Sequence, residues 1–295
     1  MEIRKSYLDG SISFITPHRK SRPHAVNNKK KCPFCRGNEY LTPPTIIQYS
    51  KKGKWEIRVV ENLFPIVSPK AGKPTNSRFY ASLRAYGFHE VVIDHYKHEK
   101  RFWQFSPKHI ENWIKILLER YADLKSKRKI KYVFIFKNFG NKSARSIEHE
   151  HTQIVALPII PTRVKDKIMS LKKYYIKNDE CFLCSLSREK RFLIKENKHF
   201  SLVYNPVPII ENQMLIIPKR HFSEFDEIRK NEMSSLAKSL KHGTKLTARY
   251  SYNLAFFPFM KKEKYLHFHI EILPRKQVYG SIELVLQNYV ISSLI

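Results

Sequence analysis

The sequence has no apolar run that approaches the roughly 20 residues of a membrane-spanning helix. Its first residues, MEIRKS, lack the apolar core of a signal peptide. These absences predict a soluble, cytoplasmic protein that does not enter a membrane. The 295 residues are 42% hydrophobic, which is enough for the buried core of one large domain or of two moderate ones.

Cysteine is scarce, and the four cysteines form two pairs with the spacing CxxC. The first pair is Cys32 and Cys35, and the second is Cys181 and Cys184. In a chain without an export signal, such pairs predict metal ligands before disulfides. A thioredoxin-type redox motif is the competing interpretation, but neither pair opens a helix in a recognisable βαβ unit.

Acidic residues are also scarce, with 26 Asp and Glu against 55 Lys and Arg and a formal net charge of +29. Such a balance attracts phosphates, on small molecules or on nucleic acid, so nucleic acid stays a candidate partner. A general lysine bias that gives a solvated basic surface explains the same balance. Aromatic residues are not interleaved with the basic runs, as a single-strand binder would require.

Two histidines and a glutamine alternate in residues 148–153, EHEHTQ, directly before an apolar run. Alternation is the period of a β-strand, so His149, His151 and Gln153 are predicted to project from one strand face. Two imidazoles and an amide on one face are typical of a functional site. The alternative is a solvated strand that carries two histidines by chance.

The order of features recurs along the chain, which predicts two copies of one α+β unit built on an antiparallel sheet. Each copy has a CxxC pair, strands, a helix, a further strand and a last strand with the pattern HxHx(Q/E). The first helix is predicted to begin at Ser106, and the second is predicted to be capped by Ser223, with Asp226 completing a capping box. The predicted boundary lies in a Lys-rich helix and divides the chain into residues 1–170 and 171–295.

Each half combines two thiols with distant histidines, as structural zinc sites with four sulfur and nitrogen ligands do. In the second half the histidines would be His267 and His221. In the first half they would be His149 and one of three upstream histidines, His89, His95 and His98. Spacing leaves that choice open, and it also allows iron at either site.

Several motifs together resemble those of the galactose-1-phosphate uridylyltransferase family. Residues 32–39, CPFCRGNE, are similar to its CPFCPGNE segment, and residues 138–153 resemble its N-x-G…GxSxxHPHxQ segment. Similar motifs also occur at residues 16–23, 60–65, 217–221 and 267–275. The resemblance covers nearly the whole chain and implies two tandem histidine-triad-like half-domains. ADP-glucose phosphorylases and dinucleotide polyphosphate phosphorylases share this branch of the histidine-triad superfamily.

The resemblance implies a two-step nucleotidyl transfer in carbohydrate metabolism, such as galactose metabolism. His151 would attack the α-phosphorus of a nucleoside diphosphate sugar, and a sugar 1-phosphate would then take the nucleotide from the histidine. Gln153 would donate its amide to a phosphate oxygen. Histidine-triad hydrolases carry a third histidine at that place, so the glutamine favours a transferase.

The motifs and the charge also allow two other functions. A phosphorylase would use inorganic phosphate on ADP-glucose or on a dinucleotide polyphosphate. A non-catalytic nucleotide- or RNA-binding protein would use the basic surface, although intact His151 and Gln153 argue against it. The resemblance also suggests a homodimer.

The family resemblance also implies roles for the remaining site residues, position by position. Ser146 would contact the departing or incoming phosphate, and Asn138 and Gly140 would line the same pocket. The nucleotide would be met by Arg19, Arg22 and Asn62. Two zinc ions would take as ligands Cys32, Cys35, His98 and His149, and Cys181, Cys184, His221 and His267.

Some positions depart from the family pattern. Ala144 stands where the family usually has glycine, Arg145 where it has a small residue, and Glu150 where uridylyltransferases have proline. Arg145 and Glu150 are therefore predicted to decide the substrate. Near the end, Glu283 matches the family, but the glycine-rich continuation is replaced, which predicts a changed sugar-phosphate end of the site.

Overall fold

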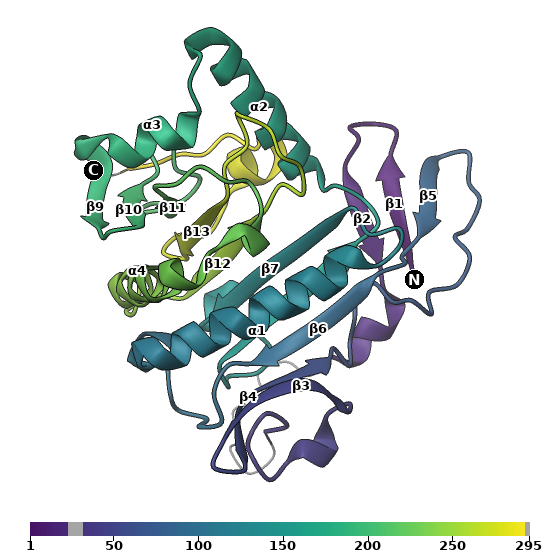
Figure 1. Ribbon diagram of the computed structural model, residues 1–295. Helices are drawn as coiled ribbons and strands as arrows, with labels where there is room; N and C mark the ends of the chain where they lie inside the picture. Colours follow the sequence, from purple (N-terminus) through teal and green to yellow (C-terminus); the bar gives the residue numbers. More distant parts are fainter. Residues whose placement is uncertain (23–31, 293–295) are drawn as a thin grey trace. The chain divides into compact units, whose positions relative to one another are not determined.

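The computed structural model describes residues 1–22 and 32–292 (Figure 1). The chain divides into two compact units. The first unit comprises Met1–Glu99, Ile116–Ile135 and Ser146–Ser170. The second comprises Lys100–Lys115, Phe136–Arg145 and Leu171–Ile295. Both units combine antiparallel sheets with helices, which confirms the predicted α+β class.

The first unit is built on an antiparallel sheet with the strand order β3-β4-β6-β8. Its strands are β3 (Thr45–Lys51), β4 (Lys54–Glu61), β6 (Phe88–Ile93) and β8 (His151–Leu157). Every residue of β8 is buried. The register sets Val91 opposite Gln153 and Ile93 opposite His151, so these four side chains share one face of the sheet.

A smaller antiparallel sheet of the first unit has the order β2-β1-β5. Its strands are β1 (Glu2–Ser6), β2 (Ile12–Ile15) and β5 (Tyr80–Arg84). A 3₁₀ turn, η1 (Pro17–Ser21), follows β2 and carries Arg19.

Helix α1 (Pro107–Ser126) begins where the sequence predicts. The hydroxyl of Ser106 accepts the backbone N–H of His109 at 3.1 Å, as an N-capping serine does. The helix contributes residues to both units, as do the strand β7 (Tyr132–Phe139) and the helix α2 (Thr162–Asn178).

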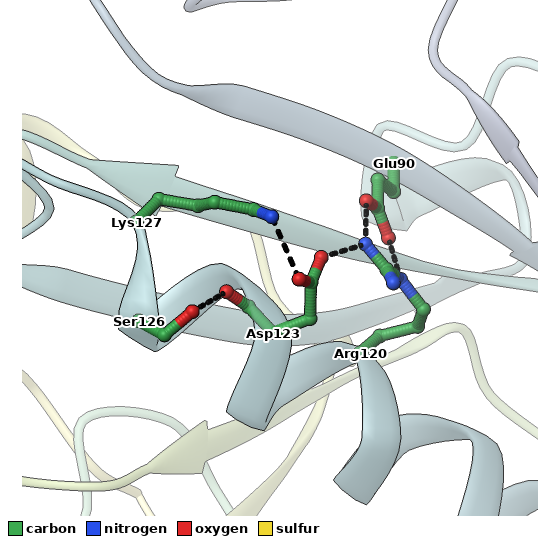
Figure 2. A network of polar contacts seen from close by, with 5 residues as sticks. All are labelled: Glu90, Arg120, Asp123, Ser126 and Lys127. Carbon is green, nitrogen blue, oxygen red and sulfur yellow. Dashed lines mark hydrogen bonds and ion pairs between the residues drawn. The ribbon is translucent and has the colours of Figure 1, made fainter.

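An ion pair fastens α1 to the sheet of the first unit (Figure 2). Arg120 donates from its guanidinium to both oxygens of Glu90 in β6, at 2.6 and 2.8 Å, and to Asp123 at 2.8 Å. Burial raises the pKa of Glu90, and the hydrogen bonds from Arg120 oppose that rise. Because side chains alternate along β6, Glu90 faces α1 while His89 and Val91 face the other way.

The second unit has an antiparallel sheet with the order β12-β13-β11-β10-β9, and β12 also pairs with residues 136–139 of β7. Its strands are β9 (Leu193–Glu196), β10 (Phe200–Tyr204), β11 (Met214–Pro218), β12 (Tyr252–Phe257) and β13 (His269–Pro274). Its helices are α3 (Phe182–Arg188) and α4 (Met233–Leu246), and a π-helical turn covers Ile282–Leu286.

The predicted helix at Ser223 is wrong in its start, because α4 begins only at Met233. Residues 225–232 form two 3₁₀ turns, η7 (Phe225–Glu227) and η8 (Lys230–Glu232). Ser223 donates its hydroxyl to the carbonyl of Lys261 at 2.6 Å and therefore caps no helix. Glu232 accepts the backbone N–H of Arg229 instead, at 2.9 Å, which orders the turn before α4.

Among residues 1–22 and 32–292, no helix combines the length and the apolar content needed to cross a membrane.

Candidate active site

The first CxxC pair and two histidines form a group that can hold a metal ion. The ligand atoms of Cys32, Cys35, His98 and His149 all lie within 4.8 Å of one another. Nδ1 of His149 lies 3.6 Å from both sulfurs, and Nδ1 of His98 lies 3.5 Å from the sulfur of Cys35. The group therefore takes His98 from the three candidate histidines.

The surroundings of this group prepare it for a cation. Nε2 of His149 lies 2.6 Å from the backbone carbonyl of His95, to which it donates, and this leaves the lone pair of Nδ1 directed at the sulfurs. Burial raises the pKa of Cys32 to about 12. A positive ion among the four side chains would stabilise its thiolate, because metal ligation lowers the pKa of a thiol.

The second CxxC pair forms an equivalent group in the second unit. It consists of Cys181, Cys184, His221 and His267, again with ligand atoms within 4.8 Å of one another. Nδ1 of His267 lies 3.3 Å from the sulfur of Cys184 and 3.7 Å from that of Cys181. The structure thus brings together both sets of four residues that the sequence predicts.

His151 opens β8 with its ring orientation fixed. Its Nδ1 lies 2.8 Å from the backbone carbonyl of His149, and since a carbonyl only accepts, Nδ1 carries the proton. The lone pair of the neutral ring is then on Nε2. The ring of Phe34, between the two cysteines of the first pair, packs edge-on against His151 with centroids 5.3 Å apart.

A cavity of about 310 Å³ in the first unit has His151 in its wall. This volume lies at the lower end of the range for small-ligand pockets. Its polar lining includes Arg22, Asn62, Ser146 and Gln153, while apolar side chains come from Phe34, Leu41, Val60, Leu63, Phe64, Val91 and Ile147. An apolar wall with a few convergent polar groups is typical of a binding site.

Basic groups lie beside this cavity. Arg22 donates to the hydroxyl of Ser146 at 2.9 Å, which joins two residues far apart in the sequence. Arg19 donates to the backbone carbonyl of Phe64. Burial lowers the pKa of both arginines. The wall therefore offers a guanidinium and a hydroxyl near His151, a combination that suits a phosphate oxygen.

At the far end of the histidine motif, Gln153 lies among polar partners. Its side-chain oxygen is 3.0 Å from Nε2 of His89 and 3.4 Å from the amide nitrogen of Asn62. His89 is thus a partner of Gln153 and not a member of the metal group. The nucleophile candidate His151 and the amide of Gln153 come from one strand, β8, and the fold brings Arg22 and Asn62 to them from other segments.

Residues 2–161 match the family described as galactose-1-phosphate uridyl transferase, N-terminal domain, which is more than half of the sequence. The chain belongs to this family. Residues 125–251 also match a domain of unknown function, DUF4922. The prediction of a transferase of this family is confirmed.

The relatives include both transferases and a phosphorylase. ADP-glucose phosphorylase of Arabidopsis thaliana is 27% identical over 305 aligned positions, covering 96% of this chain and 87% of the relative. Galactose-1-phosphate uridylyltransferase of Thermotoga maritima is 28% identical, covering 94% and 88%. A solved structure of an Arabidopsis thaliana ADP-glucose phosphorylase with bound ADP-glucose has a TM-score of 0.81 at 27% identity, covering 98% of this chain and 94% of that one.

The remaining residues implied by the family motif lie in different places. Asn138 and Gly140 belong to the second unit and are not among the described residues that line the cavity. Asn138 accepts the side-chain amide of Asn253 at 2.8 Å. Gly140 has a φ of +82°, and a side chain there would meet Ser251.

The three residues that depart from the uridylyltransferase pattern lie in different surroundings. Ala144 has the left-handed φ of 62°, which explains why the family favours glycine there. Arg145 lies with its guanidinium over the ring of Phe139, 5.0 Å from the centroid. Glu150 is buried and directly precedes β8. It is not among the described residues that line the cavity.

In the second unit, β13 corresponds to β8 but carries a carboxylate where β8 carries an amide. In β13, Nδ1 of His269 lies 3.1 Å from the carbonyl of His267, the same contact that orients His151. The place of Gln153 is taken by Glu271, whose carboxylate lies 3.5 Å from Nε2 of His269. The ring of His269 is stacked on Phe257 at 5.1 Å.

Proposed function

We propose that this protein is a nucleotidyltransferase that moves a nucleoside monophosphate between a nucleoside diphosphate sugar and a sugar 1-phosphate through a covalent nucleotidyl-histidine. The observation that carries this proposal is the placement of His151. Its Nδ1 is tied to the carbonyl of His149, so the lone pair is on Nε2, in a side chain that lines the cavity. A neutral imidazole held in this way is a good nucleophile near neutral pH.

In the first step, the lone pair of Nε2 attacks the α-phosphorus of the donor. The bond between that phosphorus and the bridging oxygen breaks, and a sugar 1-phosphate leaves with the electron pair. In the second step, a phosphate oxygen of the acceptor attacks the same phosphorus and the bond to Nε2 breaks. His151 therefore ends each cycle in the state in which it began.

The neighbouring residues have distinct roles in this proposal. Gln153 donates its side-chain amide to an oxygen of the reacting phosphate and stabilises charge without giving up a proton. Arg22 and Ser146, already hydrogen bonded to each other, hold the remaining phosphate oxygens. Arg19, Asn138 and Gly140 keep the substrate-binding roles implied by the family motif.

We infer zinc in both metal groups. Tetrahedral zinc with sulfur at about 2.3 Å and nitrogen at about 2.0 Å sets these two ligand atoms about 3.5 Å apart. The sulfur–nitrogen distances of 3.5 and 3.6 Å in the first group and of 3.3 to 3.7 Å in the second fit that geometry. Zinc in the first group would hold the segment that leads into His151. The division into halves at residue 170 and the homodimer belong to the same proposal.

A phosphorylase is the second candidate. It differs in the acceptor alone, since inorganic phosphate would replace the sugar 1-phosphate in the second step. The relative from Arabidopsis thaliana, an ADP-glucose phosphorylase aligned with 96% of the chain, favours it. The first step and the role of His151 are the same in both.

The decisive experiment follows the label from donor to protein and then to acceptor. The protein is incubated separately with UDP-glucose, ADP-glucose and diadenosine tetraphosphate, each labelled at the α-phosphorus, and with the sugar nucleotides labelled in the hexose. We expect acid-labile α-phosphorus label on the protein and no hexose label. Release of the label by galactose 1-phosphate supports the uridylyltransferase, whereas release by inorganic phosphate alone supports the phosphorylase. No label from any donor would contradict both.

A further inference from the structure

The ring of His89 is held in one protonation pattern by the backbone. Its Nδ1 lies 3.2 Å from the backbone N–H of Ile66, which can only donate, so Nδ1 accepts. The proton of the neutral ring is therefore on Nε2. Nε2 lies 3.0 Å from the side-chain oxygen of Gln153 and donates to it.

A second donor points at the same oxygen. The side-chain oxygen of Asn62 accepts the backbone N–H of Phe64 at 2.8 Å, which fixes the amide of Asn62 and directs its nitrogen toward Gln153. That nitrogen lies 3.4 Å from the oxygen of Gln153. It also lies 3.0 Å from Nε2 of His89.

We propose that His89 is a positioning residue that locks the side chain of Gln153 with its oxygen held inside the protein and its amide N–H groups presented to the substrate phosphate. This inference rests on the proposed nucleotidyl transfer and adds the residue on which the orientation of the amide depends. Gln153 can serve the phosphate only in one of its two orientations, because the flipped amide would turn an oxygen toward a phosphate oxygen. Asn62, which also lines the cavity, is the second donor to the oxygen of Gln153.

The position of His89 suits this task. It lies on β6 two residues before Val91, which is opposite Gln153, so both side chains share the cavity face of the sheet. The histidine is 6% exposed. Burial, chiefly, lowers the pKa of His89 to about 3, so the ring stays neutral and keeps a single tautomer.

The second unit contains the same device with other residues. Gln213, two residues before Leu215, takes the place of His89, since Leu215 is opposite Glu271. Its oxygen accepts the backbone N–H of Ile209 at 2.8 Å, and its amide donates to Glu271 at 3.1 Å.

The turn before this position is repeated as well. Asn205 accepts the N–H of Val207 with its side chain, as Asn62 does from Phe64. The sequences NLFPI, at residues 62–66, and NPVPI, at residues 205–209, thus form corresponding turns. A glutamine at position 89 can therefore accept the backbone N–H of Ile66 in the turn and donate its amide to Gln153 on β8.

This correspondence supplies matched variants. In His89→Asn, the side-chain oxygen can still accept from Ile66, but no donor from position 89 reaches Gln153, and only the longer contact from Asn62 is left. In His89→Gln, both hydrogen bonds can form, as they do at Gln213. We expect the rate of label transfer to His151 to fall about 10-fold to 100-fold in His89→Asn, the usual cost of losing an orienting partner. The rate in His89→Gln should stay within about threefold of the wild type.

A double-mutant cycle separates positioning from general structural support. In a Gln153→Ala background, His89→Asn should cause no further loss of rate, because the group that it orients is already gone. An equal loss in both backgrounds, or equal damage from asparagine and glutamine at position 89, would overturn the inference.

A second measurement does not depend on activity. In protein labelled with ¹⁵N-histidine, the His89 signals, assigned by their absence in His89→Gln, should show a protonated Nε2 and an unprotonated Nδ1. The opposite tautomer would overturn the inference even if label transfer occurs. The expected tautomer without any label transfer would instead contradict the proposed function and leave the orientation of Gln153 supported.

Discussion

In each compact unit a pair of histidines leads into a buried strand. The first histidine, His149 or His267, joins a CxxC pair, and the second, His151 or His269, donates from Nδ1 to the carbonyl of the first. Beyond this common frame the two strands differ. Both second histidines are buried, but His151 lines a cavity, whereas His269 is stacked on Phe257.

The last polar residue of each motif explains the difference in chemistry. Gln153 has amide N–H groups to offer an anion, whereas Glu271 can only accept when ionised. In the second unit the carboxylate faces His269 at 3.5 Å, where a substrate phosphate would meet a like charge. The metal group and the contact to the backbone carbonyl are therefore common to both strands. The cavity and the amide of Gln153 are found at the first strand, and they suit it to phosphate chemistry.

The largest expected effect is the loss of the nucleophile. In His151→Asn the amide can replace Nδ1–H as the donor to the carbonyl of His149, but no lone pair is left at the place of Nε2. We expect label transfer to fall by at least about 10⁴-fold, as when other enzymes lose a nucleophile. The matched control His269→Asn should transfer label at the wild-type rate. Similar losses in the two variants would contradict the proposal that β8 carries the nucleophile and β13 does not.

An exchange of the last polar residues should have the next largest effect. Gln153→Glu replaces an amide donor by a carboxylate beside the substrate phosphate, and we expect single-turnover label transfer to slow by about 10²- to 10³-fold. Glu271→Gln keeps an oxygen that can accept from Gln213 and should leave that rate unchanged. A full rate in Gln153→Glu would show that the amide is not needed.

Removal of one thiol from each metal group tests whether both ions serve the reaction. Cys35→Ser and Cys184→Ser remove the sulfur that contacts both histidines of its group. Each variant should lose about one of two metal ions per chain by metal analysis. Label transfer should slow by about 10- to 100-fold in Cys35→Ser, because the first group orients the segment of His151. Equal slowing in Cys184→Ser would give the second metal group a role that we assign only to the first.

The smallest expected effect is on stability in acid. The pKa of His89 is about 3 in the folded protein against an ordinary 6.5, so the unfolded chain takes up this proton first. The contribution to stability is complete above pH 6.5 and falls as the pH drops toward 3. At pH 5 it has fallen by about 2 kcal/mol.

The control for this loss is His89→Gln, which carries the residue found at position 213. Denaturant unfolding at pH 7 and pH 5 should show a smaller loss of unfolding free energy in this variant than in the wild type. Parallel losses in the two proteins would mean that His89 is not protonated on unfolding in this range.

The sequence predicted the metal groups well, because a CxxC pair and a histidine beside a recognisable strand form a compact pattern. It could not predict the contact between His89 and Gln153. His89 was one of three candidate metal ligands, and only the strand register decides that it faces Gln153 while His98 reaches Cys35. The equal turns at residues 62–66 and 205–209 were the signal that could have revealed it.

Other errors have local causes. The apolar spacing after Ser223 suits a helix, but its hydroxyl contacts Lys261, and Arg220 holds Glu232 by a 2.9 Å ion pair before α4 begins. Strand β5, with half-buried residues and no clear alternation of burial, gives a weak signal in the sequence. Glu150 directly precedes β8 and is not among the described residues that line the cavity, and its influence on the substrate stays a prediction.

The two compact units are interleaved along the chain, and this limits how the protein can be taken apart. Lys100–Lys115 and Phe136–Arg145 precede the histidine motif in the sequence but belong to the second unit. There Trp113 packs against Phe256, and Lys241 donates to the carbonyl of Phe105 at 2.7 Å. A gene cut after residue 170 would therefore separate both segments from the unit to which they belong. We expect neither piece, expressed alone, to form a complete unit.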